Sequence, residues 1–131
     1  MTINAYQAAR SRAETPRAAE LRLMREITGE MLTAHEAGLK GALLMPSLYR
    51  NREMWTAFVT DCGARGNTLP VELRAKIISL GLWVDRFTSD VVAGRESIME
   101  LITVNRTIME GLAGQGGGDT MPAPPATAAA A

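Results

Sequence analysis

The stretch that decides the fold runs from Asn67 to Leu112 and reads NTLPVELRAKIISLGLWVDRFTSDVVAGRESIMELITVNRTIMEGL. It holds two amphipathic helical patterns, about 70–93 and about 97–113, with Gly94 between them. In both, apolar residues recur at three- and four-residue steps, which is the period of an α-helix. The first pattern is apolar most of the way round, so we predict that this helix lies centrally in a helical bundle.

Two more helices are predicted upstream. Thr15 can cap, and Pro16 can open, a helix of about 16–37 with a buried stripe along it. Ser47 can cap a second helix that reaches about residue 65. Residues 38–46 fit either an apolar loop or a helical turn, and residues 3–11 fit a short helix. The stripe of the first helix consists of Leu21, Met24, Ile27 and Met31.

These elements predict an all-α fold. Short connections favour a compact antiparallel bundle of about four long helices, with the short N-terminal helix added. One helical domain should span residues 1–113. Residues 114–131 are rich in Gly, Pro and Ala, and we expect this tail to be disordered because it holds too little apolar surface to offset its ordering entropy.

Composition and charge narrow the class of protein. Fourteen basic and fourteen acidic residues cancel, so no overall field draws the chain to nucleic acid or to a membrane. No apolar run reaches the roughly 18 residues of a membrane span, and Cys62 is the only cysteine, which fits a reducing cytoplasm. Residues 1–25 are locally basic, with five arginines against two glutamates, and this leaves direct RNA contact open as an alternative.

The residues offer little for catalysis. His35 is the only histidine, and no cluster has the ligand spacing of a metal site. No glycine-rich phosphate loop follows a strand, and no paired acids are indicated. We therefore expect no enzyme, no cofactor and no metal, with His35 on a helix surface and Cys62 as a buried, inert thiol.

The remaining features suit binding. Eight methionines are many for 131 residues, and methionine side chains repack easily in grooves that accept helices. Asn51 and Asn105 interrupt apolar faces, either as structural determinants or, for Asn105, as a contact to a ligand backbone. Gly81 could permit close approach of a neighbouring helix. The candidate partner-binding residues, chosen as aromatic or apolar side chains near stripe edges and element ends, are Tyr6, Leu48, Tyr49, Trp55, Met99 and Met109.

The chain resembles the flagellar biosynthesis family FlaF over nearly all of residues 4–112. Several segments match in order, which is more specific than any single motif. The matching segments are NAYQAARSRAETPRAAELRLM (4–24), NREMW (51–55), DCGARGNTLPVELRAKIISLGLWV (61–84) and VNRTIMEGL (104–112).

The resemblance implies a cytoplasmic, non-enzymatic factor linked to flagellin synthesis or secretion. Flagellin termini are disordered before export and become amphipathic helices in the filament, and a helical groove could cover such a segment. The resemblance thus favours a flagellin-binding secretion chaperone. The alternative is a regulator of flagellin mRNA translation, acting through the partner regulator FlbT or by direct RNA contact.

Overall fold

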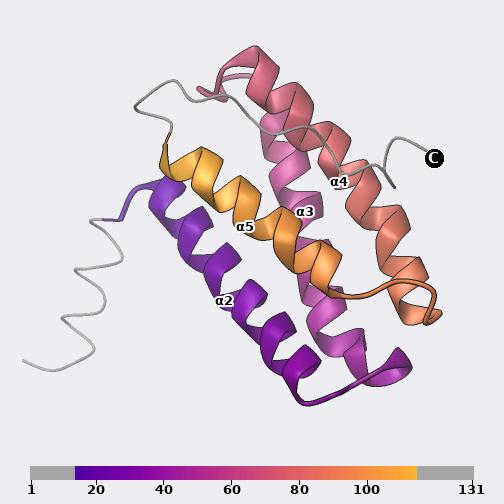
Figure 1. The fold of residues 1–131 in the computed structure, drawn as a ribbon. Helices are drawn as coiled ribbons and strands as arrows, with labels where there is room; N and C mark the ends of the chain where they lie inside the picture. Colours follow the sequence, from indigo (N-terminus) through magenta and orange to yellow (C-terminus); the bar gives the residue numbers. More distant parts are fainter. Residues whose placement is uncertain (1–13, 115–131) are drawn as a thin grey trace, which may run out of the picture.

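Four long helices form an up-and-down bundle in the computed structural model, which describes residues 14–114. They are α2 (Pro16–Glu36), α3 (Met45–Gly63), α4 (Val71–Val92) and α5 (Met99–Ala113), with a 3₁₀ turn η1 (Gly41–Leu44) before α3. Figure 1 shows α2 and α4 running in one direction and α3 and α5 in the other. The predicted all-α antiparallel bundle is confirmed for the described residues, where no strand occurs.

The start of α2 follows the predicted capping pattern. The Ala18 backbone N–H donates to Thr15 Oγ1 over 3.0 Å, and Pro16 occupies the first turn, where its missing N–H costs nothing. Of the predicted stripe, Met24, Ile27 and Met31 are buried, whereas Leu21 is only half-buried at its edge.

The start of α3 differs from the prediction. The ambiguous segment before it becomes the 3₁₀ turn η1, and α3 begins at Met45, so Ser47 is inside the helix rather than its cap. Pro46 fits the first helical turn without breaking it, because that turn has no partner for an N–H. The Ser47 hydroxyl instead donates to the Leu44 carbonyl over 3.2 Å.

The link between α4 and α5 turns at Gly94. Its φ of 79° lies in the left-handed region that glycine adopts without steric cost. The following Arg95 N–H reaches back to the Asp90 carbonyl over 2.9 Å, as in a Schellman C-cap. The chain then reverses, so that α5 returns along the bundle.

The core is one cluster that all four helices share. α3 packs most extensively on α4, α2 packs on α5, and the α4–α5 contact is slight. Gly81 permits the close approach of α3 and α4, as predicted: a Cβ at this position would lie 2.2 Å from Val59 Cγ2. Trp83 and Phe87 stack within the core with ring centroids 4.6 Å apart.

A buried polar cluster, made of Thr28, Asn51, Trp55 and Asn105, links three helices. Asn105 Oδ1 accepts from the Trp55 indole N–H over 2.8 Å, and Asn105 Nδ2 donates to Asn51 Oδ1 over 2.8 Å and to Thr28 Oγ1 over 3.1 Å. Thr28 donates in turn to the Met24 carbonyl over 2.6 Å. Asn105 is thus a structural determinant, because every bond it makes here is internal to the bundle.

Some predictions fall outside the described part of the chain. The short helix over residues 3–11, Tyr6 and the tail from residue 115 onwards lie there. Among the described helices, none is both long and apolar enough to cross a membrane.

Candidate functional site

Within residues 14–114, no three His, Cys, Asp or Glu side chains are grouped to hold a metal ion. His35 is exposed near the end of α2, as expected.

Cys62 is a buried thiol, as predicted. It is 1% exposed near the end of α3. Burial, and secondarily the charges of Asp61 and Glu20, raise the pKa of the Cys62 thiol to about 11. A thiol with so high a pKa holds little of the nucleophilic thiolate at neutral pH.

Several exposed apolar side chains lie instead on the surface that α3 and α4 form together. Met45 is 40% exposed, Tyr49 58% and Leu82 60%. We call this surface the α3–α4 groove and define it by six residues. They are Met45, Tyr49, Arg52 and Thr56 on α3, and Leu82 and Asp85 on α4.

Two cavities lie along the α3–α4 groove. One, of about 290 Å³, is lined by Met45, Leu48 and Tyr49 on α3 and by the last turns of α4. The other, of about 180 Å³, lies further along α3 around Trp55 and Thr56. Arg52 lines both cavities and so stands between them.

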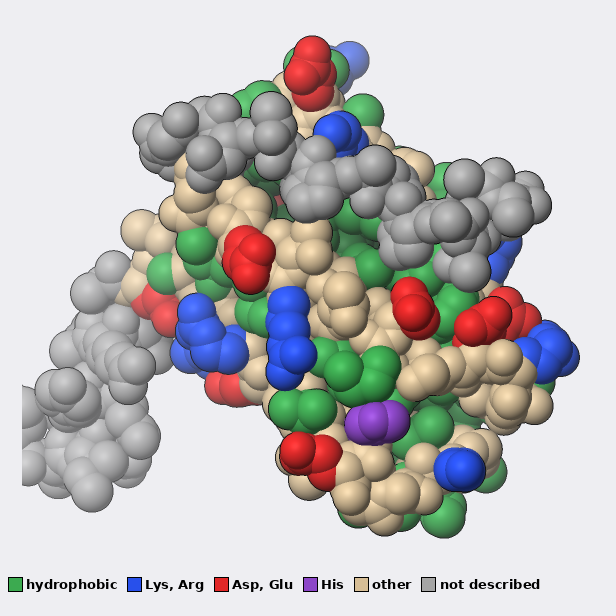
Figure 2. Space-filling model, viewed as in Figure 1, with side chains coloured by type: hydrophobic (Ala, Val, Ile, Leu, Met, Phe, Trp, Pro, Cys, Tyr) green, Lys and Arg blue, Asp and Glu red, His purple; other side chains and the backbone are tan. Residues whose placement is uncertain are grey.

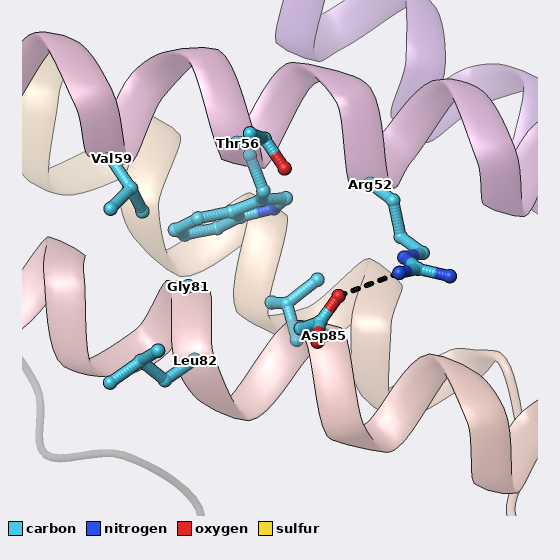
Figure 3. A pocket seen from close by; sticks show the side chains of 8 residues that line it. Arg52, Thr56, Val59, Gly81, Leu82 and Asp85 are labelled. Carbon is cyan, nitrogen blue, oxygen red and sulfur yellow. Dashed lines mark ion pairs between the residues drawn. The ribbon is translucent and has the colours of Figure 1, made fainter.

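An ion pair crosses the groove at this central position. Arg52 Nη2 lies 2.9 Å from Asp85 Oδ1, and both side chains are largely exposed. Figure 3 shows Arg52 reaching across from α3 to Asp85 on α4, with Gly81 on the side of α4 that faces Val59. Because Gly81 has no side chain, α3 and α4 approach closely where Gly81 lines the second cavity.

The predicted binding residues fall into three groups. Leu48, Tyr49 and Trp55 come together at the α3–α4 groove, but only Tyr49 is exposed there. Leu48 is 0% and Trp55 2% exposed, so they form its floor. Met99 and Met109 lie on α5, half-buried against the core and away from both cavities. Tyr6 lies outside the described residues. That these residues bind a partner stays a prediction.

Sequence reasoning missed five of the six groove residues: Met45, Arg52, Thr56, Leu82 and Asp85. Leu82 carried a signal, since it is an apolar residue off the main seam of α4. Arg52 and Asp85 carried none, because each resembles an ordinary residue on a solvated helix face. Their pairing depends on how α3 and α4 cross.

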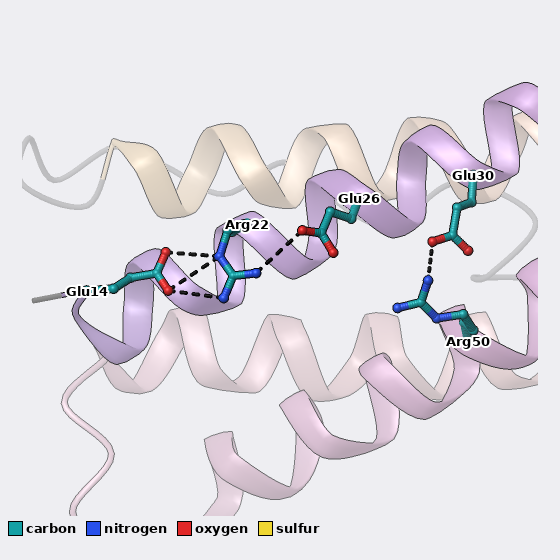
Figure 4. Close-up of polar contacts among 5 residues, drawn as sticks. All are labelled: Glu14, Arg22, Glu26, Glu30 and Arg50. Carbon is teal, nitrogen blue, oxygen red and sulfur yellow. Dashed lines mark hydrogen bonds and ion pairs between the residues drawn. The ribbon is translucent and has the colours of Figure 1, made fainter. Parts of the chain in front are cut away.

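The basic segment is largely neutralised where the structure describes it. Arg22 bonds Glu14 over 3.1 Å and Glu26 over 3.4 Å, and Arg17 bonds Glu20 over 2.7 Å. Figure 4 shows Arg22 between its two glutamates, and a separate pair between Glu30 on α2 and Arg50 on α3.

The wider surface around α2 and α5 is mixed in sign. Figure 2 shows basic and acidic side chains interspersed over the coloured part of this face, with apolar side chains between them. This pattern differs from the basic stripe of a nucleic-acid-binding domain.

Comparison with models of known protein families gives a match. The sequence model of the family described as "Flagellar protein FlaF" matches residues 2–112. No curated protein sequence and no solved structure gives a significant match.

Proposed function

This chain belongs to the flagellar protein FlaF family, and we propose that it is a non-enzymatic flagellar biogenesis factor that binds flagellin in the cytoplasm. It would act as a secretion chaperone or assembly factor that promotes flagellin synthesis and export. The observation that carries the proposal is the family match over residues 2–112, which covers α2, α3 and α4 and all but the last residue of α5.

The geometry supports a binding role in two ways. The exposed apolar side chains of the α3–α4 groove offer a contact surface for an amphipathic segment. The described residues also group no side chains for metal chemistry, and the one cysteine among them is buried with a raised pKa.

The test is co-elution with the flagellin of the same cell. The two purified proteins are mixed and run on size-exclusion chromatography with light scattering, at low and moderate salt. We expect a 1:1 complex at both, because salt screens charge contacts but leaves apolar burial intact. Absence of co-elution under both conditions would contradict flagellin binding.

The second candidate is regulation of flagellin mRNA translation, through FlbT or by direct RNA contact. The excess of arginine in residues 1–25 favours it. Against it, Arg17 and Arg22 are held by glutamates. Direct binding would show an RNA affinity that falls steeply with rising salt. Action through FlbT would show co-elution with FlbT in place of flagellin.

A further inference from the structure

The four helices form two pairs that meet along a seam. α3 and α4 pack on each other most extensively, and the 3₁₀ turn η1 packs on both of them. α2 packs most extensively on α5. Between the pairs, α2 packs less extensively on α3, and α4 touches α5 only slightly. We call the boundary between the α2–α5 pair and the η1–α3–α4 unit the seam.

Both connections that cross the seam lie at one end of the bundle (Figure 1). They are residues 37–40, between α2 and η1, and residues 93–98, between α4 and α5. The two connections line one cavity of about 420 Å³ and therefore lie side by side. Each turns at a glycine in the left-handed region, Gly38 with a φ of 74° and Gly94 with a φ of 79°. A hinge motion is absorbed by a few residues at element ends such as these.

At the opposite end, no peptide segment within residues 14–114 crosses the seam. A polar cavity of about 360 Å³ lies there, lined by Arg17 and Glu20 of α2 on one side and by Asp61 and Arg65 on the other. Burial raises the pKa of the Glu20 carboxyl, Arg17 opposes this, and the negative charge of Asp61 raises it further. Two like charges therefore act on each other across the seam at this end, which we call the mouth.

The hydrogen bonds at the centre of the seam have a fixed direction. The Trp55 indole N–H is a donor only, so Asn105 Oδ1 must accept from it and Asn105 Nδ2 must donate to Asn51 Oδ1. This order leaves Asn51 Nδ2 with no hydrogen-bond partner among the described residues, although Asn51 is 0% exposed. The closed seam thus holds a desolvated donor, and its cost is relieved when water enters.

From this arrangement we propose that the bundle is a hinged clamp, in which the α2–α5 pair swings as one body against the η1–α3–α4 unit. Residues 37–40 and 93–98 form the hinge, and the mouth opens. The motion leaves the helices and the packing inside each pair in place. It breaks the bonds from Asn105 to α3 and the exposed Glu30–Arg50 ion pair, which contributes little to stability.

Cys62 is a natural probe of this motion. It is 1% exposed near the end of α3, and charges on both α2 and α4, those of Glu20 and Arg74, act on its thiol. A thiol reagent therefore reaches Cys62 only after an opening, and the labelling rate reports the population of the opened form when closing is fast.

The experiment measures the rate of Cys62 labelling in the full chain over a range of low urea concentrations. Urea denaturation of the same protein gives the labelling rate that global unfolding alone allows. We expect Cys62 to be labelled about tenfold or more faster than this limit. The rate should also depend less on urea than global unfolding does, because opening the clamp exposes less surface.

Two variants in a Cys62→Ala background locate the opening. Met24→Cys places the probe at a buried position on the mouth half of α2, and Val91→Cys places it at a buried position that lines the cavity at the hinge. Each rate is compared with the global-unfolding limit of the same variant, and circular dichroism confirms folding. Ile27→Cys and Ile98→Cys replace them if either variant is unfolded. We expect the α2 probe to exceed its limit by about tenfold or more and the hinge probe to match its limit.

Three results would overturn the hinged clamp. Labelling of Cys62 at the global-unfolding limit would mean that the seam opens only when the whole bundle unfolds. Fast labelling of Cys62 without fast labelling of the α2 probe would mean that only the end of α3 frays. Labelling above the limit at Cys62, at the α2 probe and at the hinge probe alike would mean that the two pairs do not turn about residues 37–40 and 93–98.

Discussion

Asn105 on α5 accepts a hydrogen bond from the buried indole of Trp55 on α3, with 2.8 Å between the oxygen and nitrogen atoms. The two residues are 50 positions apart in the chain. Since α5 packs mainly on α2 and only slightly on α4, this bond helps to fix the axial position of α5 against α3. A buried polar contact of this kind selects one register among apolar alternatives.

Replacing Asn105 should cost more stability than replacing Asn51. Asn105→Leu leaves the Trp55 indole N–H and Asn51 Oδ1 buried without a partner, and we expect a loss of about 3 kcal/mol. Asn51→Leu leaves Asn105 Nδ2 bonded to Thr28. It also removes Asn51 Nδ2, a buried nitrogen with no hydrogen-bond partner among the described residues. We expect a loss of about 1 kcal/mol.

Urea denaturation, followed by circular dichroism, measures both changes. Arg106→Leu, at the exposed neighbouring position, is the control and should stay within about 0.5 kcal/mol of the unsubstituted protein. An Asn51→Leu loss equal to or larger than that of Asn105→Leu would show that Asn105 is not the centre of the cluster.

Gly81→Ala should destabilise the bundle although alanine is the better helix former. The new Cβ would lie 2.2 Å from Val59 Cγ2, and valine has little freedom to rotate in a helix. We expect a net loss of about 1–2 kcal/mol in the free energy of unfolding. Adding Val59→Ala to this variant should cost less than Val59→Ala costs alone, because it relieves the contact.

Gly29→Ala is the matched control for this position. Gly29 lies within α2, and a Cβ there would meet nothing within 4 Å. This substitution should stabilise the protein by about 0.5–1 kcal/mol. If thermal denaturation shows Gly81→Ala to be stabilised as much as Gly29→Ala, the close approach of α3 and α4 is not as described.

Cys62 should make stability fall at high pH. Burial raises the pKa of its thiol from an ordinary value of 9.0 to about 11, so the folded chain disfavours the thiolate. Its contribution to stability is therefore complete below pH 9 and is lost as the pH rises through 11. Denaturation curves at several pH values should show a steeper decline over this window than those of Cys62→Ala, which lacks the group. Parallel declines would refute the raised pKa.

Reversing the Arg52–Asp85 ion pair tests whether a bound partner contacts Arg52. Arg52→Glu with Asp85→Arg retains opposite charges across the α3–α4 groove but exchanges their places. Because the pair is exposed, we expect the stability to change by less than about 1 kcal/mol. Flagellin affinity, measured by calorimetry, should fall, since position 52 no longer presents the guanidinium donors to the bound flagellin segment. Unchanged affinity would mean that the pair only bridges α3 and α4.

The helices were predictable because their signals are local. Thr15 and Pro16 mark the start of α2, and Gly94 marks the turn after α4, each through chemistry within a few residues. The start of α3 was predicted wrongly, because Ser47 and Pro46 are each compatible with positions on either side of a helix boundary.

The groove and the polar cluster were only partly predictable, because they depend on how helices cross. The sequence showed Asn51 and Asn105 as polar interruptions of apolar faces. It did not show that the two side chains contact each other, since 54 positions separate them in the chain. The sequence likewise indicated a close approach of helices at Gly81, but it did not indicate that Val59 is the residue that Gly81 meets. The Arg52–Asp85 pair joins two helices and has no local signal at all.

Hydrogen exchange measured by mass spectrometry tests the central claim most directly. The full chain is labelled with and without flagellin, and the change in exchange is compared along the helices. We predict protection in peptides that cover residues 45–56 of α3 and 82–92 of α4, with little change over the first half of α2. Protection confined to α2 and α5, or none anywhere in the bundle, would contradict flagellin binding at the α3–α4 groove.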